Sequence, residues 1–380
     1  MKKLFTSESV TSGHPDKICD QISDAILDAY LSQDKNAKVA CEVCVHKNGV
    51  LIMGEVTSQN LVDIESIARE KIIEIGYDND SLEFNGEKVP ITIHMNTQSP
   101  DIALGVEKED MGAGDQGMVF GYATNETDKY LPMPIYYAHA LAKQLELARK
   151  KKILPYLRPD GKTQVTVEYE NGIPKRIDSI VIAAQHNPDI SLEKLKEDIK
   201  REVIFKIIPK KLLDEKSNYY INTTGRFVLG GPASDSGLTG RKIIVDTYGG
   251  YARHGGGAFS GKDASKVDRS GAYYARYVAK NIVAAALAKE IEIQVSYAIG
   301  YSKPVSISIN TNGTNSIEEE KILAVIKQVF DFSPKHMITE LKLDTPIYQE
   351  TTCYGHFGKN LPWEKLDKIA TIKEVLKNLK

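Results

Sequence analysis

The sequence predicts an α+β fold in which a unit of helix, strand, strand and helix occurs three times. Apolar residues recur at helical spacing in three long segments, and two alternating, strand-like segments follow each of them. Two of the three strand pairs are separated by an Asn-Gly turn, which is a strong hairpin signal. Because hairpins pair antiparallel, we expect mixed, mainly antiparallel sheets with helices on one face.

The first copy begins with a helix in which Ile18, Ile22 and Ile26 form one apolar stripe. Its two strands meet at Asn48-Gly49, and a second helix follows them. The four elements are expected over residues 17–32, 38–46, 50–57 and 61–75.

The second and third copies repeat this order of elements. The second hairpin turn is Asn171-Gly172. The other face of each sheet could pack on another sheet of the same chain or on another subunit. The alternating patterns do not distinguish these two arrangements. The second copy is expected over residues 134–150, 163–170, 175–184 and 191–207, and the third over 265–289, 292–299, 305–310 and 317–330. Further strands are expected over 89–95, 118–123, 219–221 and 242–246.

The composition excludes a general attraction to nucleic acid or to anionic membranes. Lys and Arg number 49 and Asp and Glu number 51, so the net charge is -2. No apolar run follows the first lysines, and none approaches the about 20 residues that cross a bilayer. We therefore expect a cytoplasmic protein that binds neither nucleic acid nor membrane.

The four cysteines do not indicate a disulfide scaffold in a chain of 380 residues. Cys41-x-x-Cys44 has the spacing of half a zinc site, but it lies in an alternating run. Side chains three apart on a strand point to opposite faces, so we interpret both cysteines as packing residues.

Gly112–Gly117 matches the glycine pattern of dinucleotide-binding loops. That motif needs a strand before it and a helix after it, whereas here a charged run precedes it and a strand follows. A dinucleotide site is therefore not expected.

Gly256–Lys262 matches a phosphate-binding P-loop up to its lysine, but Asp263 stands where the motif needs Ser or Thr. A predicted strand over 242–246, the glycines and the following helix still favour a phosphate site. A P-loop-like ATPase or kinase and a non-catalytic nucleotide-binding protein remain alternatives. Basic residues surround this loop, namely Arg241, Lys242, Arg253, Lys262, Lys266 and Arg269.

His14, Asp16 and Asp268 have simple structural explanations when each is taken alone. Pro15 suits the first turn of a helix and Asp16 suits its positive end, so both residues could serve only to cap that helix. Asp268 could be a surface carboxylate on the third long helix.

Together, several motifs resemble the S-adenosylmethionine synthetase (methionine adenosyltransferase) family. The resemblance runs from about Leu4 to about Asp367, with the motifs in the family's order. The motifs are Gly13–Lys17, Gly112–Thr127, Gly225–Phe227, Leu238–Gly250, Gly255–Asp263 and Tyr354–Gly358.

This resemblance implies three similar α+β domains around a pseudo-threefold axis, over residues 2–100, 111–230 and 231–372. It also implies a flexible active-site lid over 98–112, and a homodimer or dimer of dimers with active sites at the dimer interface. The lid appears a few residues shorter here than in common bacterial members, and Ser236 stands where some members have cysteine.

The implied reaction joins two substrates, ATP and L-methionine. The methionine sulfur attacks C5′ of ATP, and the released triphosphate is then hydrolysed to pyrophosphate and phosphate. A thioether carries no proton to remove, which agrees with the absence of a Ser-His-Asp pattern. Cations placed on the leaving triphosphate would stabilise the transition state. The implied cofactors are Mg²⁺, two per site, and K⁺, one per subunit.

The resemblance also assigns roles by position. Catalytic residues are His14, Lys162, Arg241, Lys262 and Lys266. ATP-binding residues are His14, Asp160, Gly161, Lys162, Arg226, Phe227, Asp235, Arg241, Lys242, Ala258 and Lys262. Methionine-binding residues are Glu55, Gln98, Asp115, Asp235 and Lys266. Metal ligands are Asp16 and Asp268 for Mg²⁺ and Glu42 for K⁺.

Overall fold

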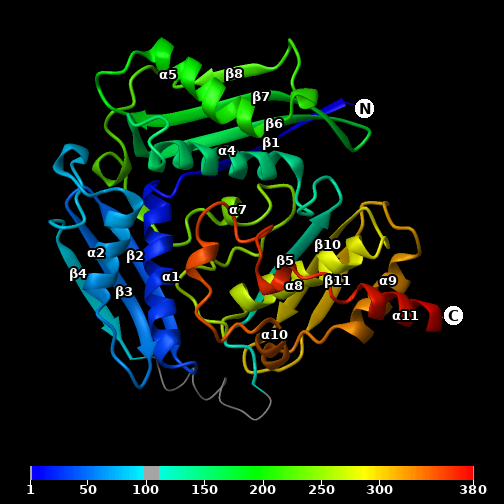
Figure 1. Cartoon of the computed structure of the whole chain (residues 1–380). Helices are drawn as coiled ribbons and strands as arrows, with labels where there is room; N and C mark the ends of the chain where they lie inside the picture. The colour runs from blue at the N-terminus through cyan, green and yellow to red at the C-terminus, as the bar shows by residue number, and fades with distance from the viewer. Residues whose placement is uncertain (1, 98–110, 380) are drawn as a thin grey trace.

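The computed structural model describes residues 2–97 and 111–379 and contains three sheets, each covered by helices on one face (Figure 1). The first sheet has the order β4-β3-β2-β9, with α1 and α2 packed on it. Its strands are β2 (Lys38–His46), β3 (Gly49–Thr57), β4 (Ile91–Asn96) and β9 (Gly237–Leu238), and its helices are α1 (Pro15–Gln33) and α2 (Ile64–Ile75).

The second sheet has the order β1-β6-β7-β8 and is covered by α4. A π-helical turn over Lys200–Ile204 joins two shorter helices beside it. The strands are β1 (Lys2–Val10), β6 (Leu157–Glu170), β7 (Ile173–His186) and β8 (Asn218–Ile221), and the helices are α4 (Met133–Lys150), α5 (Leu192–Ile199) and α6 (Phe205–Ile207).

The third sheet has the order β11-β10-β5, and α8 packs on it. The strands are β5 (Gly117–Thr124), β10 (Glu290–Tyr297) and β11 (Ser306–Asn310), and the helices are α8 (Val267–Ala284), α9 (Glu319–Val329), α10 (Pro334–Leu341) and α11 (Ile369–Asn378). Short 3₁₀ turns lie at Asp80–Leu82, Lys210–Leu212, Gly231–Ala233, Gln349–Thr351 and Pro362–Glu364.

The predicted α+β class with mixed, mainly antiparallel sheets is confirmed. Two pairs are parallel, β3 with β4 and β7 with β8, and the other pairs are antiparallel. Both Asn-Gly hairpins form, and Asn171 and Gly172 have φ of 52° and 78°, which is the left-handed backbone that such a turn requires.

The predicted strand over 242–246 is wrong, because these residues form the helical turn α7 (Ile243–Asp246). Ile243, Ile244 and Val245 favour a strand by β-propensity, but tertiary contacts override that preference here. Ion pairs from Lys242 and Asp246 to α1 hold both ends of the turn.

Each sheet includes a strand from a distant part of the chain. β1 pairs with β6 along its whole length, from Lys2 opposite Glu170 to Val10 opposite Lys162. β5 joins β10, and β9 joins β2. The three sheets, each with its helices, are therefore linked by strands that the chain exchanges between them. This exchange places loops from distant segments side by side.

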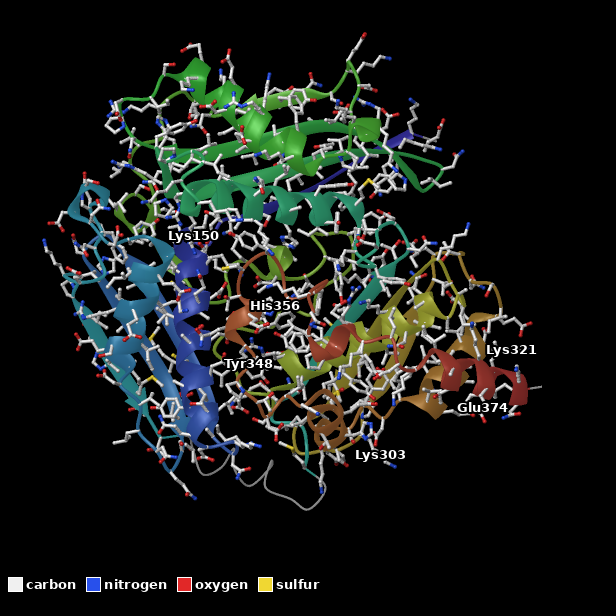
Figure 2. The ribbon with its side chains drawn as sticks, viewed as in Figure 1. Lys150, Lys303, Lys321, Tyr348, His356 and Glu374 are labelled. Carbon is white, nitrogen blue, oxygen red and sulfur yellow. The ribbon has the colours of Figure 1, made fainter. Side chains whose placement is uncertain are left out.

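The helices α1, α4 and α8 lie on the inner sides of their sheets and surround α7 (Figure 1). Tyr348 and His356, both fully buried, lie among them, whereas Lys321 and Glu374 project at the surface (Figure 2). None of the helices in the described ranges combines the length and apolar character that a membrane crossing requires.

Candidate active site

The start of α1 positions His14 and Asp16. His14 caps the helix, and its Nδ1 accepts a hydrogen bond of 3.2 Å from the backbone N–H of Asp16. Pro15 occupies the first turn, where a missing N–H leaves no donor unpaired. Asp16 accepts from the backbone N–H of Leu238 at 3.0 Å and from Lys242 Nζ at 2.5 Å. Asp16 therefore lies in the first turn as predicted, but the side-chain cap is His14, and the Asp16 carboxylate binds Leu238 and Lys242 instead of capping its own helix.

The surroundings of His14 keep its ring neutral. Burial, together with the charges of Lys242 and Lys162, lowers its pKa to about 3 against the opposing charge of Asp16. Because Nδ1 accepts a hydrogen bond, the proton of the neutral ring lies on Nε2. Burial alone would raise the pKa of Asp16, but its bonds to Lys242 and Leu238 outweigh burial and lower it. The site therefore contains a neutral imidazole donor beside a carboxylate.

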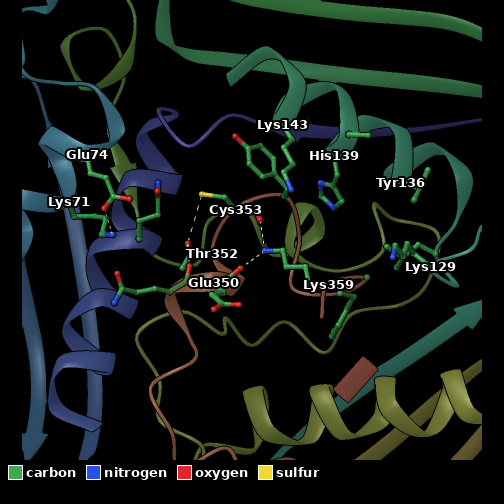
Figure 3. A pocket seen from close by; sticks show the side chains of 17 residues that line it. Lys71, Glu74, Lys129, Tyr136, His139, Lys143, Glu350, Thr352, Cys353 and Lys359 are labelled. Carbon is green, nitrogen blue, oxygen red and sulfur yellow. Dashed lines mark hydrogen bonds and ion pairs between the residues drawn. The ribbon is translucent and has the colours of Figure 1, made fainter. Parts of the chain in front are cut away.

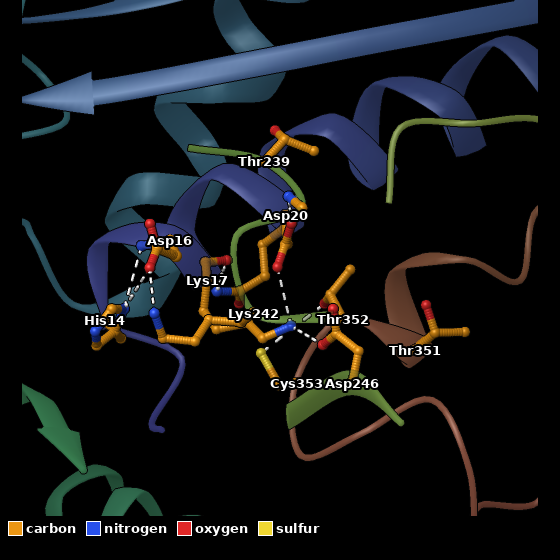
Figure 4. Close-up of polar contacts among 12 residues, drawn as sticks. His14, Asp16, Lys17, Asp20, Thr239, Lys242, Asp246, Thr351, Thr352 and Cys353 are labelled. Carbon is orange, nitrogen blue, oxygen red and sulfur yellow. Dashed lines mark hydrogen bonds and ion pairs between the residues drawn. The ribbon is translucent and has the colours of Figure 1, made fainter. Parts of the chain in front are cut away.

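A second ion pair, which is buried, joins α1 to α7 (Figure 4). Lys17, next to Asp16, donates to Asp246 at the end of α7 and to Asp20 at 2.9 Å. Lys242 directly precedes α7. The two helices are consequently connected at both ends of α7, and Lys242 is held against Asp16.

β6 brings Asp160, Gly161 and Lys162 to this region. Asp160 accepts from the backbone N–H of Gly231 at 2.9 Å, and burial raises its pKa to about 6. The carbonyl of Gly161 accepts from the backbone N–H of Thr11, three residues before His14. Lys162 is exposed and makes no ion pair within the described ranges, so its ammonium group is available to a ligand.

Phe227 is held by its backbone and is partly buried. Its N–H donates to His186 Nε2 at 3.1 Å, and its carbonyl accepts from His186 N–H at 2.9 Å. Three neighbouring predicted residues, Arg226, Asp235 and Arg241, are exposed.

The glycine-rich loop packs its backbone against β2. The carbonyl of Gly261 accepts from Cys41 N–H at 2.9 Å, and Lys262 forms an isolated bridge with that strand. Lys262 Nζ donates to Asp268 at 2.8 Å. A Cβ at Gly257 would lie 2.2 Å from the Asp268 carboxyl carbon, so glycine lets the loop pack against this carboxylate in its present position.

The start of α8 is fixed by a buried bidentate pair. Both terminal nitrogens of Arg269 contact Asp24 on α1 at 2.7 Å. Arg269, one of the basic residues around the glycine-rich loop, is thus a buried structural residue. Lys266 donates to Asp263, whose other contacts are backbone N–H groups of β2 and of the loop. Asp263, which departs from the P-loop pattern, serves to fix the loop.

The remaining predicted residues lie at the border of this region. Burial raises the pKa of Glu42 on β2, opposed by the charge of Lys262. Glu55 on β3 and Asp115 before β5 are exposed. Gln98 and residues 98–110 of the predicted lid lie outside the described residues.

The predicted charged residues therefore fall into two groups on one chain. We define the α1 group as His14, Asp16, Asp160, Lys162 and Lys242, and the glycine-loop group as Glu42, Lys262, Lys266 and Asp268. The loops beside the two groups come close at Gly240, where an added Cβ would lie 2.3 Å from the Cβ of Ala258. Within the described parts of the chain, no hydrogen bond or ion pair links a side chain of one group to the other.

The carboxylates fit a divalent cation that is shared with a phosphate ligand. No cluster of three or more His, Cys, Asp and Glu side chains occurs among the described residues. Mg²⁺ is commonly held by one or two carboxylates together with substrate phosphates, so isolated carboxylates suit it. Asp16 and Asp268 each present hard oxygen ligands beside a lysine that balances their charge in this structure.

Sequence reasoning missed Lys17 and Asp246, which position the α1 group. A signal was present, since Asp20, Asp24 and Asp28 recur every four residues along a helix that also carries the apolar stripe of Ile18, Ile22 and Ile26. Such a stripe of carboxylates facing the core requires buried cations or N–H donors.

Three family profiles match consecutive parts of the chain. Residues 2–100 match the S-adenosylmethionine synthetase N-terminal domain, residues 110–227 its central domain and residues 229–365 its C-terminal domain. The chain belongs to the S-adenosylmethionine synthetase family.

Full-length relatives agree with this assignment. The S-adenosylmethionine synthase of Finegoldia magna is 57% identical, over 99% of this chain and 100% of that protein. Those of Clostridium botulinum and Clostridium tetani are 57% and 56% identical over the same shares. These alignments extend over 391 or 392 positions although this chain has 380 residues, so part of each relative has no counterpart here.

Proposed function

We propose that the protein makes S-adenosylmethionine from ATP and L-methionine and hydrolyses the released triphosphate to pyrophosphate and phosphate. The observation that carries this proposal is the presence of two carboxylate–lysine pairs, Asp16–Lys242 and Asp268–Lys262, in a chain of this family. An ATP triphosphate provides the anionic oxygens that such lysines bind once a cation occupies the carboxylates.

The chemistry needs a stabilised leaving group more than a base. The methionine sulfur forms a bond to C5′ of ATP as the bond from C5′ to the triphosphate oxygen breaks. His14 would donate from Nε2 to that oxygen or to one beside it, because the proton of the neutral ring lies on Nε2 while Nδ1 accepts from Asp16 N–H. Lys162, exposed beside it, would add positive charge. Arg241, Lys262 and Lys266 would hold the rest of the polyphosphate.

Binding of the two substrates uses residues around these charges. Phe227 would stack on adenine, with Asp160, Gly161, Arg226 and Ala258 along the nucleotide. The methionine would be held by Glu55, Gln98, Asp115, Asp235 and Lys266, under the lid over 98–112.

Asp16 and Asp268 would hold two Mg²⁺ ions, and Glu42 would hold K⁺. These ions neutralise phosphate charge, which lowers the barrier to departure of the triphosphate. The structure supports Glu42 for a weakly bound cation, because burial raises the pKa of this carboxyl and an added positive charge would stabilise its ionised form.

We further propose that a complete site combines the α1 group of one copy with the glycine-loop group of another, in a homodimer or dimer of dimers. The ion pairs support this division, since Asp16–Lys242 lies within the α1 group and Asp268–Lys262 within the glycine-loop group, and among the described residues no ion pair joins the two groups. Large apolar side chains on the strands are also exposed, as at an unfilled interface. They include Met53, Ile93, Met118 and Leu238.

The domain limits of 2–100, 111–230 and 231–372 and the cytoplasmic location stay predictions. Incubation of the purified protein with ATP, Mg²⁺ and K⁺, with and without methionine, tests the function by mass spectrometry. We expect S-adenosylmethionine, phosphate and pyrophosphate only when methionine is present. ATP hydrolysis without a sulfonium product would instead support the ATPase alternative, and no turnover would support a binding protein.

A further inference from the structure

A cavity of about 610 Å³ lies on the helix side of the molecule (Figure 3). It is lined by α1, α2, α4 and a loop over residues 349–359, and it contains none of the predicted catalytic or substrate-binding residues. Its volume is typical of small-molecule sites. Tyr354–Gly358, a motif to which the reaction gives no role, supplies three of its lining residues: Tyr354, Phe357 and Gly358.

The charged side chains around the cavity are mainly cationic. Four lysines and two glutamates line it, and Lys71 is paired with Glu74 at 2.6 Å. Lys129 and Lys143 are exposed and make no ion pair with any described residue. Lys359 is held in place by three backbone carbonyls at 2.6, 3.1 and 2.6 Å. Burial lowers its pKa to about 8, so it is still mostly protonated at pH 7.

One buried polar atom at the cavity wall has no partner. His139 on α4 is 7% exposed, and its Nε2 makes no hydrogen bond in the described part of the structure. Its Nδ1 contacts Ser9 Oγ at 2.8 Å. Gly355 packs against this nitrogen, since an added Cβ there would lie 2.5 Å from Nε2. Figure 3 shows the ring between Tyr136 and Lys143. An unsatisfied buried nitrogen is unfavourable, and a polar occupant would satisfy it.

The same cavity has an apolar wall. Leu131, Tyr136, Ala140 and Phe357 supply it. Phe357 is fixed there because its ring stacks on Tyr248, with centroids 5.0 Å apart and planes 18° from parallel. A rigid aromatic surface of this kind suits a flat apolar group.

We propose that this cavity binds a small organic anion. Its carboxylate or phosphate would lie near Lys143, Lys359 and His139 Nε2, and its ring against Tyr136 and Phe357. The cavity is connected to the α1 group through α7. The backbone N–H of His356, in the loop over 349–359, donates to the Asp246 carbonyl at 2.9 Å, and Lys242 of the α1 group directly precedes α7. The proposal is independent of the reaction proposed above.

Calorimetric titration of the full protein tests this proposal, with methionine, Mg²⁺ and a non-hydrolysable ATP analogue saturating the active site. The probes are phenyl phosphate, phenylacetate and the neutral 2-phenylethanol. We expect at least one anion to bind and the alcohol to bind much more weakly, and the tighter anion identifies the head group.

The double variant K129Q/K143Q should weaken that binding by about tenfold, because it removes two of the four lysine charges that line the cavity. Both lysines are exposed, so circular dichroism should show an unchanged fold. K151Q, at the exposed C-cap of α4, is the matched control and should bind as the wild type does. Absence of anion binding, equal binding of the alcohol, or wild-type affinity in the double variant would each overturn the proposal.

Discussion

Lys17 and Asp246 form a fully buried ion pair that joins the helix carrying Asp16 to the turn that follows Lys242. Burial acts against the charge of Lys17, but the carboxylates of Asp20 and Asp246 raise its pKa overall. Burial raises the pKa of Asp246 to about 7, against the lowering effect of Lys17. This pair therefore fixes the relative positions of two predicted site residues.

Lys17→Met should lower the free energy of unfolding by about 3–5 kcal/mol, because it leaves buried carboxylates without their cation. Lys47→Met removes an exposed pair with Glu83 and should cost about 1 kcal/mol at most. Urea denaturation at one fixed protein concentration measures the free energy of unfolding of each variant. Equal effects would show that the buried pair contributes no more than a surface pair.

Lys162→Met should lower kcat by at least about 100-fold, because a charge on the leaving triphosphate is lost. Lys162 is exposed, so the melting temperature should stay within a few degrees of the wild-type value. Near-normal turnover would remove Lys162 from its proposed role.

Asp268→Asn should raise the Mg²⁺ concentration for half-maximal activity by about tenfold or more, because a neutral amide is a weaker ligand for a hard cation. Electron paramagnetic resonance of Mn²⁺ bound with ATP should show the same loss directly. Asp178→Asn, which removes a carboxylate in the central sheet, is the control. An unchanged metal requirement in Asp268→Asn would exclude this carboxylate as a ligand.

Acid should destabilise the protein through its buried histidines. Burial lowers the pKa of His139 to about 3, so between about pH 6.5 and pH 3 the unfolded chain binds a proton that the folded chain does not. The free energy of unfolding should therefore fall as the pH is lowered, by about 1.4 kcal/mol per pH unit for this histidine.

His139→Gln should reduce that slope, whereas His46→Gln, at an exposed histidine, should not. Carboxyls with raised pKa values, such as Asp160, give slopes of opposite sign, but they are common to both variants and cancel in the comparison. Denaturation at pH 7, 6 and 5 measures the slopes. Equal slopes would contradict a neutral, buried His139.

Local sequence signals predicted the elements that local chemistry controls. Both Asn-Gly hairpins, the three long helices and the strand pairs that follow them could be found because turn residues and apolar periodicity act within a few positions. β1 could not be found, because Lys2–Val10 is mostly polar and its pairing partner lies about 160 residues away.

Long-range contacts also explain what was missed near the site. α7 has the β-branched residues of a strand, but it forms a helical turn whose ends are held to α1 by the ion pairs of Lys242 and Asp246. The resemblance supplied the site residues, but not the buried pair that positions them. The sequence did not reveal that the charged residues separate into two groups on one chain.

The division of the site between two copies is tested most directly with mixed dimers. His14→Asn alters the α1 group and Lys262→Met alters the glycine-loop group, and each variant alone should be inactive as a homodimer. If the chains carry different tags and are co-expressed, dimers with one chain of each kind can be purified. Our account predicts about half of the wild-type activity in them, because one of the two symmetry-related sites receives both unaltered groups. Mixed dimers without activity would contradict it, since each chain would then hold a complete site of its own.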